Sequence, residues 1–452
     1  MNQTLLKNAR IVTDGQIKEG DLRIVGERID AIATDCAATP GETVIDVAGR
    51  YVLPGMIDSQ VHFREPGLTH KGDIASESRA ALAGGITSFF EMPNTRPATV
   101  DLEALEAKFQ LANGRAYGNF AFYLGATNDN LAQIQRLDPN VTCGIKVFMG
   151  ASTGNMLVDN PDVLDGIFRD ARTTVVTHCE DTPTILANEA DARQRFGENI
   201  PIEEHPLIRS VEACWKSSSF AAELATKHGT DLHILHLTTA KEMALFTPGP
   251  LAGKRLTAEA CVHHLWFSAS DYPRKGALIK CNPAIKFDAD RAALRSALAE
   301  DRIDLIATDH APHTWDEKHA EHYAQQPAGL PLVQHALPMA LELVRDGVLS
   351  LERVVHKIAH APAERFGIVD RGHLREGYHA DLVVVDLDSP YTVLRDGILY
   401  KCGWSPMEGE RLHARVLSTF VNGTCAYRWD GETHAFPAAP SGQRLTFNKT
   451  ST

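Results

Sequence analysis

A run of polar residues near position 60 carries the side chains best suited to chemistry. It reads Asp58-Ser-Gln60-Val-His62-Phe-Arg64-Glu-Pro-Gly and lies within an apolar stretch. Because side chains alternate faces along a β-strand, the polar residues at positions 58, 60, 62 and 64 share one face. A buried imidazole beside a buried guanidinium needs partners, and a metal ion with an anionic ligand would supply both. A polar rim on an edge strand is the alternative.

More polar residues stand at the ends of later strand candidates, namely Lys146, His178, His236 and Asp309. Each alone is weak evidence, since a strand histidine is more often a core residue than a ligand and a lysine can reach solvent. Together with His62 they form a set of imidazoles and a carboxylate that suits Zn²⁺. A lysine ammonium is a poor ligand. CO₂ would convert the neutral amine to an anionic carbamate, and burial beside metal ions would lower the pKa of that amine and favour this step.

These residues need a scaffold that brings strand ends together. Eight apolar strand candidates alternate with helical segments, at residues 52–63, 86–92, 119–125, 144–149, 173–178, 232–237, 256–264 and 304–309. This alternation predicts a (β/α)8 TIM barrel with its active site at the C-terminal ends of the strands. Helices are predicted between them, for example at 73–83, 101–112, 211–228 and 288–299, and the glycine pair at 84–85 should end the first helix.

The two ends of the chain share a different texture. Short strand-like runs with turns fill the first 50 residues and return at 381–387, 415–422 and 424–429. The two ends are predicted to pair into one small β-sandwich. The expected domains are residues 1–51 and 369–436 for the two parts of the sandwich, 52–368 for the catalytic barrel, and 437–452 for a polar, loosely held tail.

The composition excludes several classes of protein. The chain has 452 residues, 44% hydrophobic and 23% charged, which is typical of globular proteins. A net charge of −13 argues against nucleic acid as a partner. No apolar run is long enough to predict a membrane span, and the N-terminus carries no apolar signal core. Eight cysteines without a C-x-x-C pair indicate reduced thiols and predict a cytoplasmic location.

Two signature-like motifs and several shorter ones run through the chain. The first is Gln60-Val-His62-Phe-Arg64-Glu-Pro-Gly, and the second is Asp309-His-Ala-Pro-His313, followed by Lys318. Their residue types and order resemble those of the amidohydrolase superfamily and, within it, the dihydroorotases. Further matches cover nearly the whole chain: Met92-Pro-Asn94-Thr95, Lys280-Cys-Asn282-Pro-Ala, and the segments 52–58 and 377–384.

The resemblance implies a role for each candidate residue. His62 and Asp309 would bind the more buried of two metal positions, and His178 and His236 would bind the other. Lys146, as a carbamate, would bridge them, with one or two Zn²⁺ ions per chain. Asp309 would also shuttle the proton of the reaction. The implied substrate-binding residues are Arg64 and Asn94, clamping a carboxylate with help from His313, and Asn282, contacting a pyrimidine ring.

One residue departs from the family pattern. The first signature usually begins His-x-His, and Gln60 stands in place of the first histidine. A glutamine amide oxygen can ligate Zn²⁺ but is uncharged and weaker than an imidazole. The first metal position would then bind its ion more loosely, bind it through Gln60 Oε1, or be empty. The remaining ligand positions match the family pattern.

The implied activity is that of a dihydroorotase, the reversible metal-dependent closure of N-carbamoyl-L-aspartate to L-dihydroorotate in pyrimidine biosynthesis. The expected partner is this small substrate, bound by a homo-oligomer such as a dimer. Hydantoinases and allantoinases share the scaffold but act on rings that lack the carboxylate which Arg64 and Asn94 would hold. A catalytically inactive relative that scaffolds another enzyme is a third hypothesis, and Gln60 is its only support.

Other polar residues near the candidate site are expected to have supporting roles. His233 is predicted to be structural, because it lies on the opposite strand face from His236. Whether His263 or His264 faces the pocket stays open, and His310 is expected behind the site. Glu180 and Asp181 are expected at the start of the helix that follows His178, and Cys179 and Cys281 are not predicted to be nucleophiles.

Overall fold

The structure, a computed structural model, describes residues 3–150 and 154–449 and contains a closed parallel barrel. Its strands are β6 (Met56–Val61), β7 (Ile86–Glu91), β8 (Asn119–Phe122), β9 (Leu124–Gly125), β10 (Ile145–Phe148), β11 (Val175–His178), β12 (Leu232–Ile234), β13 (Leu256–Cys261) and β14 (Leu305–Ala307). They pair in the orders β6-β7-β8 and β9 through β14. A parallel bridge between Val61 and His310 closes the ring. The predicted (β/α)8 barrel is confirmed, because every strand candidate contains one of these strands.

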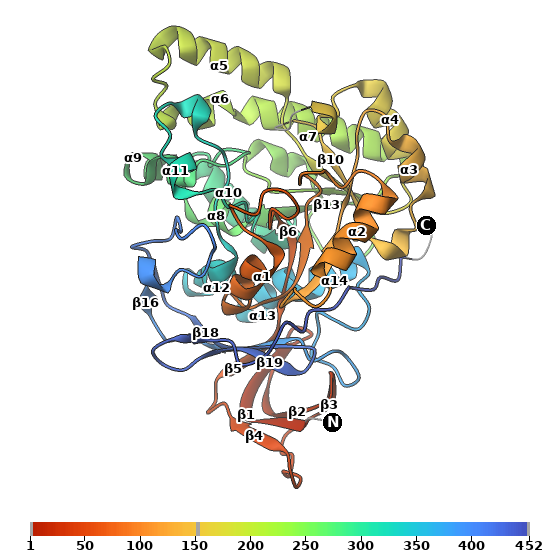
Figure 1. Ribbon diagram of the computed structural model, residues 1–452, viewed down its shortest axis with the longest axis vertical. Coiled ribbons are helices and arrows are strands. Elements are labelled where there is room, and N and C mark those ends of the chain that lie inside the picture. Colours follow the sequence, from red (N-terminus) through yellow and green to blue (C-terminus); the bar gives the residue numbers. More distant parts are fainter. Residues whose placement is uncertain (1–2, 151–153, 450–452) are drawn as a thin grey trace.

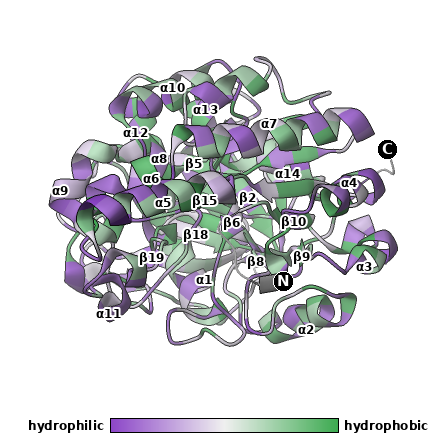
Figure 2. Ribbon diagram, turned by 90° about the horizontal axis from the view of Figure 1, so that it is seen from above, coloured by the Kyte–Doolittle hydropathy of each residue, from purple (hydrophilic) through white to green (hydrophobic). Residues whose placement is uncertain are grey.

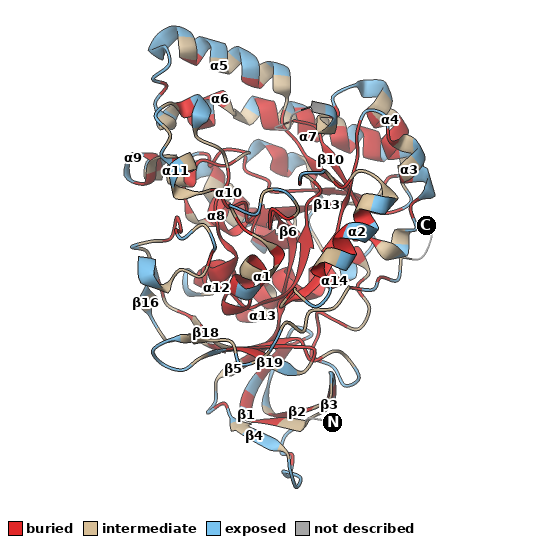
Figure 3. Ribbon diagram, in the orientation of Figure 1, coloured by how far each residue is buried: buried red, intermediate tan, exposed pale blue. Residues whose placement is uncertain are grey.

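Helices surround the barrel, as Figure 2 shows from above. Helix α1 (Ile74–Ala83) begins at Asp73, whose carboxylate accepts the Ser76 N–H, and ends at Gly84. Figure 3 shows the strands buried and the outer faces of helices exposed, so the apolar residues of both layers form one core. The predicted helices are confirmed to within a residue by α1, α2 (Leu102–Ala112), α7 (Val211–His228) and α10 (Asp288–Ala299).

Both ends of the chain join in one nine-stranded sheet, the end sheet, which lies below the barrel in Figure 1. Its own core contains Leu22, Ile24, Leu382 and Phe420. The β-rich region predicted from both ends is confirmed, and it is organised as one continuous sheet. Its strands are β1 (Gln3–Thr13), β2 (Gln16–Val25), β3 (Arg28–Ala33), β4 (Thr43–Asp46), β5 (Tyr51–Pro54), β15 (Leu382–Asp386), β18 (Arg415–Val421), β19 (Thr424–Trp429) and β20 (His434–Ala435).

The single strand predicted at 52–63 is two strands. β5 pairs with β1 and β15 in the end sheet, whereas β6 pairs with β7 in the barrel. The chain changes sheets at Gly55, where an added Cβ would lie 2.2 Å from the Thr87 side chain. Only glycine allows this close approach, and an apolar run cannot reveal it, because both strands are buried.

The segment after Pro437 is not loosely held where the structure describes it. Arg444 forms a bridge with Phe120 and Phe447 with Ile368, and Leu445 and Phe447 are buried in a core cluster. Two apolar side chains within a polar stretch are enough to dock it against the barrel. The prediction of a loose tail is therefore wrong for residues 440–449, and residues 450–452 lie outside the described part.

The strand predicted at 256–264 ends early. β13 stops at Cys261, and helix α8 (Val262–Trp266) follows directly. His263 and His264 are therefore helical residues at the C-terminal end of the barrel. Separately, no helix among the described residues is long and apolar enough to cross a membrane.

Candidate active site

The first half of the site, here called the amide half, consists of Gln60, His62 and Asp309. His62 Nε2 lies 3.1 Å from Asp309 Oδ1, and His62 Nδ1 lies 2.8 Å from Asn94 Oδ1. The amide oxygen of Asn94 can only accept, so Nδ1 carries the proton. The ends of β6, β7 and β14 thus converge, as the predicted barrel requires. Gln60 and His62 point to the same side, as the alternation of side chains along β6 predicts.

Gln60 directs a donor at the same carboxylate. Its Nε2 donates to Asp309 Oδ1 at 2.9 Å, and its Oε1 lies 3.9 Å from Cys261 Sγ. The reverse orientation would set the amide oxygen against a carboxylate oxygen, so hydrogen bonding favours this one. A metal ion between His62 and Asp309 would have to displace the amide. His62 Nε2 and Asp309 Oδ1 are two potential ligand atoms, but this half is closed to a metal ion while the amide keeps its hydrogen bond.

The second half, here called the imidazole half, consists of Lys146, His178 and His236. His178 Nδ1 lies 2.9 Å from His236 Nε2, and His178 Nε2 lies 2.8 Å from Glu180 Oε2. Glu180 accepts the Nε2 proton, which leaves a lone pair on Nδ1, aimed at His236. His236 Nε2–H can donate to this lone pair, and a metal ion can take the place of that proton. A carboxylate behind a histidine is the usual support of a metal ligand. This half fits Zn²⁺.

Lys146 is the third member of the imidazole half. Its side chain is buried, with Nζ 4.5 Å from the centroid of the Phe148 ring. Burial lowers the pKa of Lys146 to about 7, so a substantial fraction of the amine is neutral at neutral pH. Burial also lowers the pKa of each of the three site histidines, and the charge of Lys146 lowers it further, which places Nζ near all of them. Neutral imidazoles keep the lone pairs that a metal ion needs.

Glu180 has a support that the sequence did not reveal. It pairs with Arg209, which is distant from the strand ends in sequence. Although burial would raise it, the Arg209 guanidinium and His178 hold the pKa of Glu180 well below its usual range. A permanently charged carboxylate therefore orients His178. Asp181 caps α5 (Thr182–Phe196) by accepting the Thr184 N–H at 2.9 Å.

Arg64 and His313 meet at the edge of the site. Arg64 Nε donates to the Pro312 carbonyl, and Nη2 lies 3.1 Å from His313 Nε2. Lys71 donates to His313 Nδ1 at 2.9 Å, and His313 Nε2 is 3.1 Å from the Ala328 carbonyl. Because Nε2 donates to Ala328, it offers Arg64 no lone pair, and the guanidinium keeps N–H groups free for a ligand.

This edge is strongly cationic. Burial lowers the pKa of Arg64 to about 10, so the guanidinium stays charged at neutral pH. No carboxylate lies within 4.0 Å of it among residues 3–150 and 154–449. Lys71 pairs with Glu317 at 2.9 Å. The sequence analysis missed Lys71 and Glu317, although each lies within a few residues of a signature motif.

The backbone is strained at three site residues. Arg64, His236 and Asp309 have φ values of 72°, 37° and 50°, in the left-handed region that favours glycine. Each such residue costs about 1–3 kcal/mol and persists only where the surrounding structure holds it, which is common at functional sites. The three residues belong to different strand ends, so the strain is a property of the site rather than of one loop.

The sequence left open whether His263 or His264 faces the pocket. His264 Nε2 lies 3.1 Å from the Pro283 carbonyl, under the segment that carries Asn282. Both ring nitrogens of His263 and Nδ1 of His264 are buried without a hydrogen-bond partner among the described residues. Asn282 Oδ1 is also buried and unpartnered among the described residues.

The remaining polar residues are held elsewhere. His233 bonds to Thr257 at 2.9 Å and Glu259 at 3.2 Å, and His310 bonds to Glu77 at 3.0 Å. Burial raises the pKa of Cys179 to about 11 and of Cys281 to about 12, so both thiols stay protonated. Neither thiol is poised as a nucleophile.

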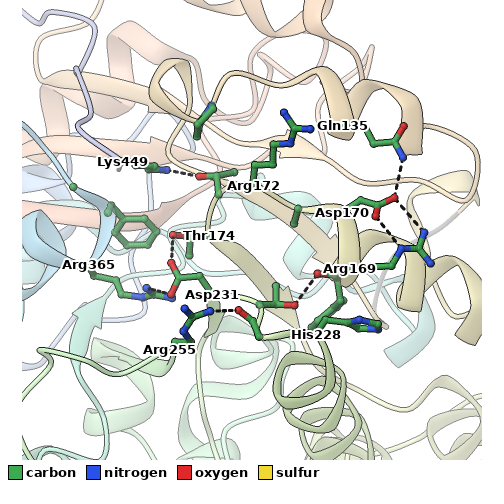
Figure 4. A pocket seen from close by; sticks show the side chains of 18 of the residues that line it. Gln135, Arg169, Asp170, Arg172, Thr174, His228, Asp231, Arg255, Arg365 and Lys449 are labelled. Atoms are coloured by element: carbon green, nitrogen blue, oxygen red, sulfur yellow. Dashed lines mark hydrogen bonds and ion pairs between the residues drawn. The ribbon is translucent and has the colours of Figure 1, made fainter. Parts of the chain in front are cut away.

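A cavity of 990 Å³ lies at the opposite end of the barrel, beside the N-terminal ends of β11 and β12 (Figure 4). Two of its arginines are already paired, Arg365 with Asp231 at 2.6 Å and Arg169 with Asp170 at 2.9 Å. It contains none of the candidate catalytic residues, so the chemistry belongs to the other end.

Comparison with known proteins agrees with this geometry. The model of the amidohydrolase family matches residues 51–426, and the chain belongs to that family, whose members are generally metal-dependent hydrolases. It is 37% identical to a dihydroorotase of Halobacterium salinarum, covering 94% of this chain and 96% of that protein. It is 32% identical to an allantoinase of Deinococcus radiodurans, covering 98% of each.

A solved structure shows the same fold. The L-hydantoinase (dihydropyrimidinase) of Arthrobacter aurescens superposes with a TM-score of 0.92 and 28% identity, covering 99% of this chain and 100% of that one. The relatives thus include enzymes named for several cyclic amides. Family membership is shown, and the substrate has to be argued from the site.

Proposed function

We propose that this protein is a dihydroorotase, which interconverts L-dihydroorotate and N-carbamoyl-L-aspartate in pyrimidine biosynthesis in the cytoplasm. The observation that carries the proposal is the Arg64 guanidinium, buried beside the metal-binding residues with no carboxylate partner in the described structure. A buried charge without a counter-charge is costly unless a ligand supplies one. Dihydroorotate carries a ring carboxylate, whereas hydantoin and allantoin do not.

The carboxylate would lie against Arg64 and Asn94, with His313 beside them. The Arg64 fork can bind both carboxylate oxygens. Asn94 presents its amide N–H groups, because its Oδ1 already accepts from His62 at 2.8 Å. Glu317 pairs with Lys71, and burial holds the pKa of His313 well below its usual value, so Arg64 supplies the net positive charge. Asn282, with its unpartnered Oδ1, would accept a ring N–H of the substrate.

The reaction itself is a hydrolysis and its reversal. Water adds to the ring amide carbon, the C–N bond breaks, and the nitrogen leaves with a proton. Asp309 would take the proton from the water and return it to the nitrogen. The hydrogen bond from Gln60 Nε2 holds its Oδ1. Lys146, His178 and His236 would hold a Zn²⁺ ion, which would polarise the carbonyl and acidify the water.

Lys146 becomes a better ligand after reaction with CO₂. The neutral amine adds to the CO₂ carbon and loses a proton, which leaves a carbamate with two anionic oxygens. The lowered pKa of Lys146, about 7, supports this step, because only the neutral amine reacts.

The second candidate function is that of a hydantoinase or allantoinase. The 32% identity to an allantoinase and the TM-score of 0.92 to an L-hydantoinase favour it. A catalytically inactive scaffold is a third possibility, and the departure at Gln60 is its only support.

A substrate comparison tests the proposal. Wild-type protein should turn over dihydroorotate with a higher kcat/KM than hydantoin or allantoin. Arg64→Ala should lower kcat/KM for dihydroorotate by about 30- to 1000-fold, the equivalent of about 2–4 kcal/mol for a charge-assisted bidentate contact. Arg79→Ala, on the exposed face of α1, serves as the control.

The outcomes separate the three functions. A wild-type preference for hydantoin or allantoin, or an Arg64→Ala variant as active on dihydroorotate as wild type, would contradict the dihydroorotase proposal. No turnover of any ring by metal-loaded protein would favour the inactive scaffold.

A further inference from the structure

His310 is held at all four of its polar atoms, although it takes no part in the proposed reaction. It is fully buried and follows Asp309 directly in the chain. Its carbonyl accepts the His62 N–H at 2.7 Å, in the bridge that closes the barrel. Its own N–H donates to Thr308 Oγ1 at 3.0 Å. Both backbone groups of His310 are therefore bonded inside the ring of strands.

The ring of His310 has one fixed orientation and one fixed tautomer. Its Nδ1 accepts the N–H of Leu332 at 2.9 Å and that of Val333 at 3.3 Å. Because these donors face Nδ1, the ring proton is on Nε2. Nε2–H donates to Glu77 Oε2 at 3.0 Å. The ring cannot turn over without losing hydrogen bonds on both sides.

Glu77 anchors this ring from a helix rather than from a strand end. It lies on α1 and is itself completely buried. Its Oε2 accepts from His310, whereas its Oε1 accepts from Ser76 Oγ at 2.9 Å and from the Lys401 N–H at 3.1 Å. Three donors offset the cost of removing this carboxylate from water. Glu77 thus ties α1 to the residue that follows Asp309.

Asp309 requires such support because its backbone is strained. Its φ of 50° lies in the left-handed region, which a non-glycine residue keeps only where its neighbours hold it. On one side, Asp58 accepts the Thr308 N–H at 3.1 Å and the Thr308 hydroxyl at 2.6 Å. On the other side stands His310, which also bonds to Thr308. The two neighbours fix the direction in which the Asp309 carboxylate leaves the backbone.

We propose that His310 and Glu77 are positioning residues of the reaction: Glu77 fixes the His310 ring, and His310 fixes the strained backbone that directs the Asp309 carboxylate. This inference rests on the proposed function, in which Asp309 carries the proton. A displacement of about 1 Å at a reacting group can cost about 100-fold in rate, so support behind Asp309 matters for turnover.

The simpler explanation is a buried polar pair that only supports packing. It accounts for the satisfied hydrogen bonds between Glu77 and His310. It predicts a loss of stability in variants of either residue, but neither a movement of Asp309 nor a loss of turnover with substrate binding retained. Those two readouts separate the explanations.

Three substitutions provide the test. Glu77→Met keeps the approximate size of the side chain and removes the acceptor of the His310 ring proton. His310→Asn offers an amide oxygen near the place of Nδ1 and gives up the bond to Glu77. His335→Asn is the matched control, because His335 is also a buried histidine that contacts Tyr400, at 3.2 Å, but is not next to a candidate site residue in the chain.

Steady-state kinetics with dihydroorotate is the first measurement. In Glu77→Met and His310→Asn, kcat should fall by about 10- to 100-fold, as is usual for supporting residues of a site. KM should change less than kcat does, because Arg64 and Asn94 would bind the substrate carboxylate independently. Metal content should stay at the wild-type level, since the imidazole half keeps its residues. His335→Asn should match wild type in both constants.

Crystal structures of the variants supply a readout that does not depend on the substrate. Asp309 should leave the left-handed region, or its carboxylate should lose the hydrogen bond from Gln60, while His178 and His236 keep their places. Folding is checked by circular dichroism, and two independent variants protect the test against the misfolding of one. Unchanged Asp309 geometry in the folded variants, or a kcat equal to that of wild type, would overturn the positioning role.

Failure of the proposed function would have a different signature. Wild-type protein would then prefer hydantoin or allantoin to dihydroorotate, and the same kinetic comparison would be made with the preferred ring. If wild type turned over no ring at all, the position of Asp309 in the crystal structures would decide the role of His310 and Glu77.

Discussion

The imidazole half and the amide half of the candidate active site hold their polar groups in opposite ways. In the first, the lone pair of His178 Nδ1 faces His236 Nε2 at 2.9 Å, because His178 Nε2 donates to Glu180. In the second, Asp309 Oδ1 already accepts from Gln60 at 2.9 Å and contacts His62 at 3.1 Å. A metal ion can replace the proton shared by two imidazoles, whereas in the amide half it would first have to displace an amide N–H from the carboxylate. One amide in place of an imidazole is enough to create this difference.

The comparison bears on the three possibilities left open for Gln60. Ligation through its Oε1 would require the amide to turn, because Oε1 lies on the side of Cys261 and Nε2 on the side of Asp309. The contacts favour a position closed by hydrogen bonds. We therefore expect one tightly held metal ion per chain in the candidate active site, in the imidazole half.

Removal of a ligand from the imidazole half should have the largest effect. His178→Ala and Lys146→Ala should each lose the metal ion and lower kcat/KM by more than about 100-fold, since loss of a supporting residue alone costs 10- to 100-fold. Small carboxylic acids should partly restore Lys146→Ala by occupying the vacated space. Metal analysis and a dihydroorotate assay measure both effects. A variant that keeps its metal and its activity would remove that residue from the imidazole half.

Gln60→His should convert the amide half into a metal position. An imidazole nitrogen is a stronger ligand of a metal ion than an amide oxygen, and the substitution also removes the amide N–H that bonds to Asp309 Oδ1. Metal content after mild chelation should therefore rise from about one to about two ions per chain. Activity should equal or exceed that of wild type. Gln60→Asn, whose shorter amide cannot reach Asp309, is the control for simple loss of the hydrogen bond.

Gln60→His could fail to bind a second metal ion because the other ring nitrogen of the new histidine needs a hydrogen-bond partner. A metal-bound imidazole needs an acceptor for its other N–H, and the nearest group on the outer side of Gln60 is Cys261 Sγ, a weak one. If Gln60→His binds no more metal than wild type and loses activity, Gln60 is an adapted residue of a one-metal site.

Supporting residues of the two halves should differ in their effect on metal affinity. Glu180→Gln replaces the carboxylate that orients His178, and it should weaken metal binding about 10- to 100-fold. Asn94→Ala removes the corresponding partner of His62 and should leave metal affinity unchanged while raising KM for dihydroorotate. Competition with a chelator gives the affinities. Equal losses in both variants would mean that both halves bind metal.

The smallest effect is on the pH dependence of stability. Glu180 has a folded-state pKa held below its ordinary value of 4.5, so its stabilisation is complete above that pH and is lost as the pH falls below it. Glu180→Gln should reduce the free energy of unfolding by about 1–3 kcal/mol at pH 7. The difference from wild type should be constant between pH 6 and 8 and should shrink below about pH 4.5 in denaturant titrations. A difference that grows on acidification would contradict the pairing with Arg209.

Much of the fold follows from patterns that act locally. Each barrel strand is a short apolar run, and each confirmed helix has its own start or stop signal, such as Asp73 and Gly84 for α1. The failures occur where a distant partner decides. The chain changes sheets at Gly55 because of Thr87, and the segment around Phe447 docks because a groove exists beside Phe90 and Ile368. The helix that carries His263 and His264 begins where β13 ends. The apolar run continues across this boundary, so the sequence pattern does not show where the strand stops.

By itself, the sequence determined the barrel and predicted the end at which the candidate residues meet, because alternation along a strand and the order of strands and helices are local properties of the chain. Only the tertiary structure decided what those residues do to one another. It turned the Gln60 amide toward Asp309, set Arg209 behind Glu180, and left Arg64 without a carboxylate partner among the described residues. Hydrogen-bond direction, burial and charge pairing depend on groups far apart in the chain, and only the folded molecule brings those groups together.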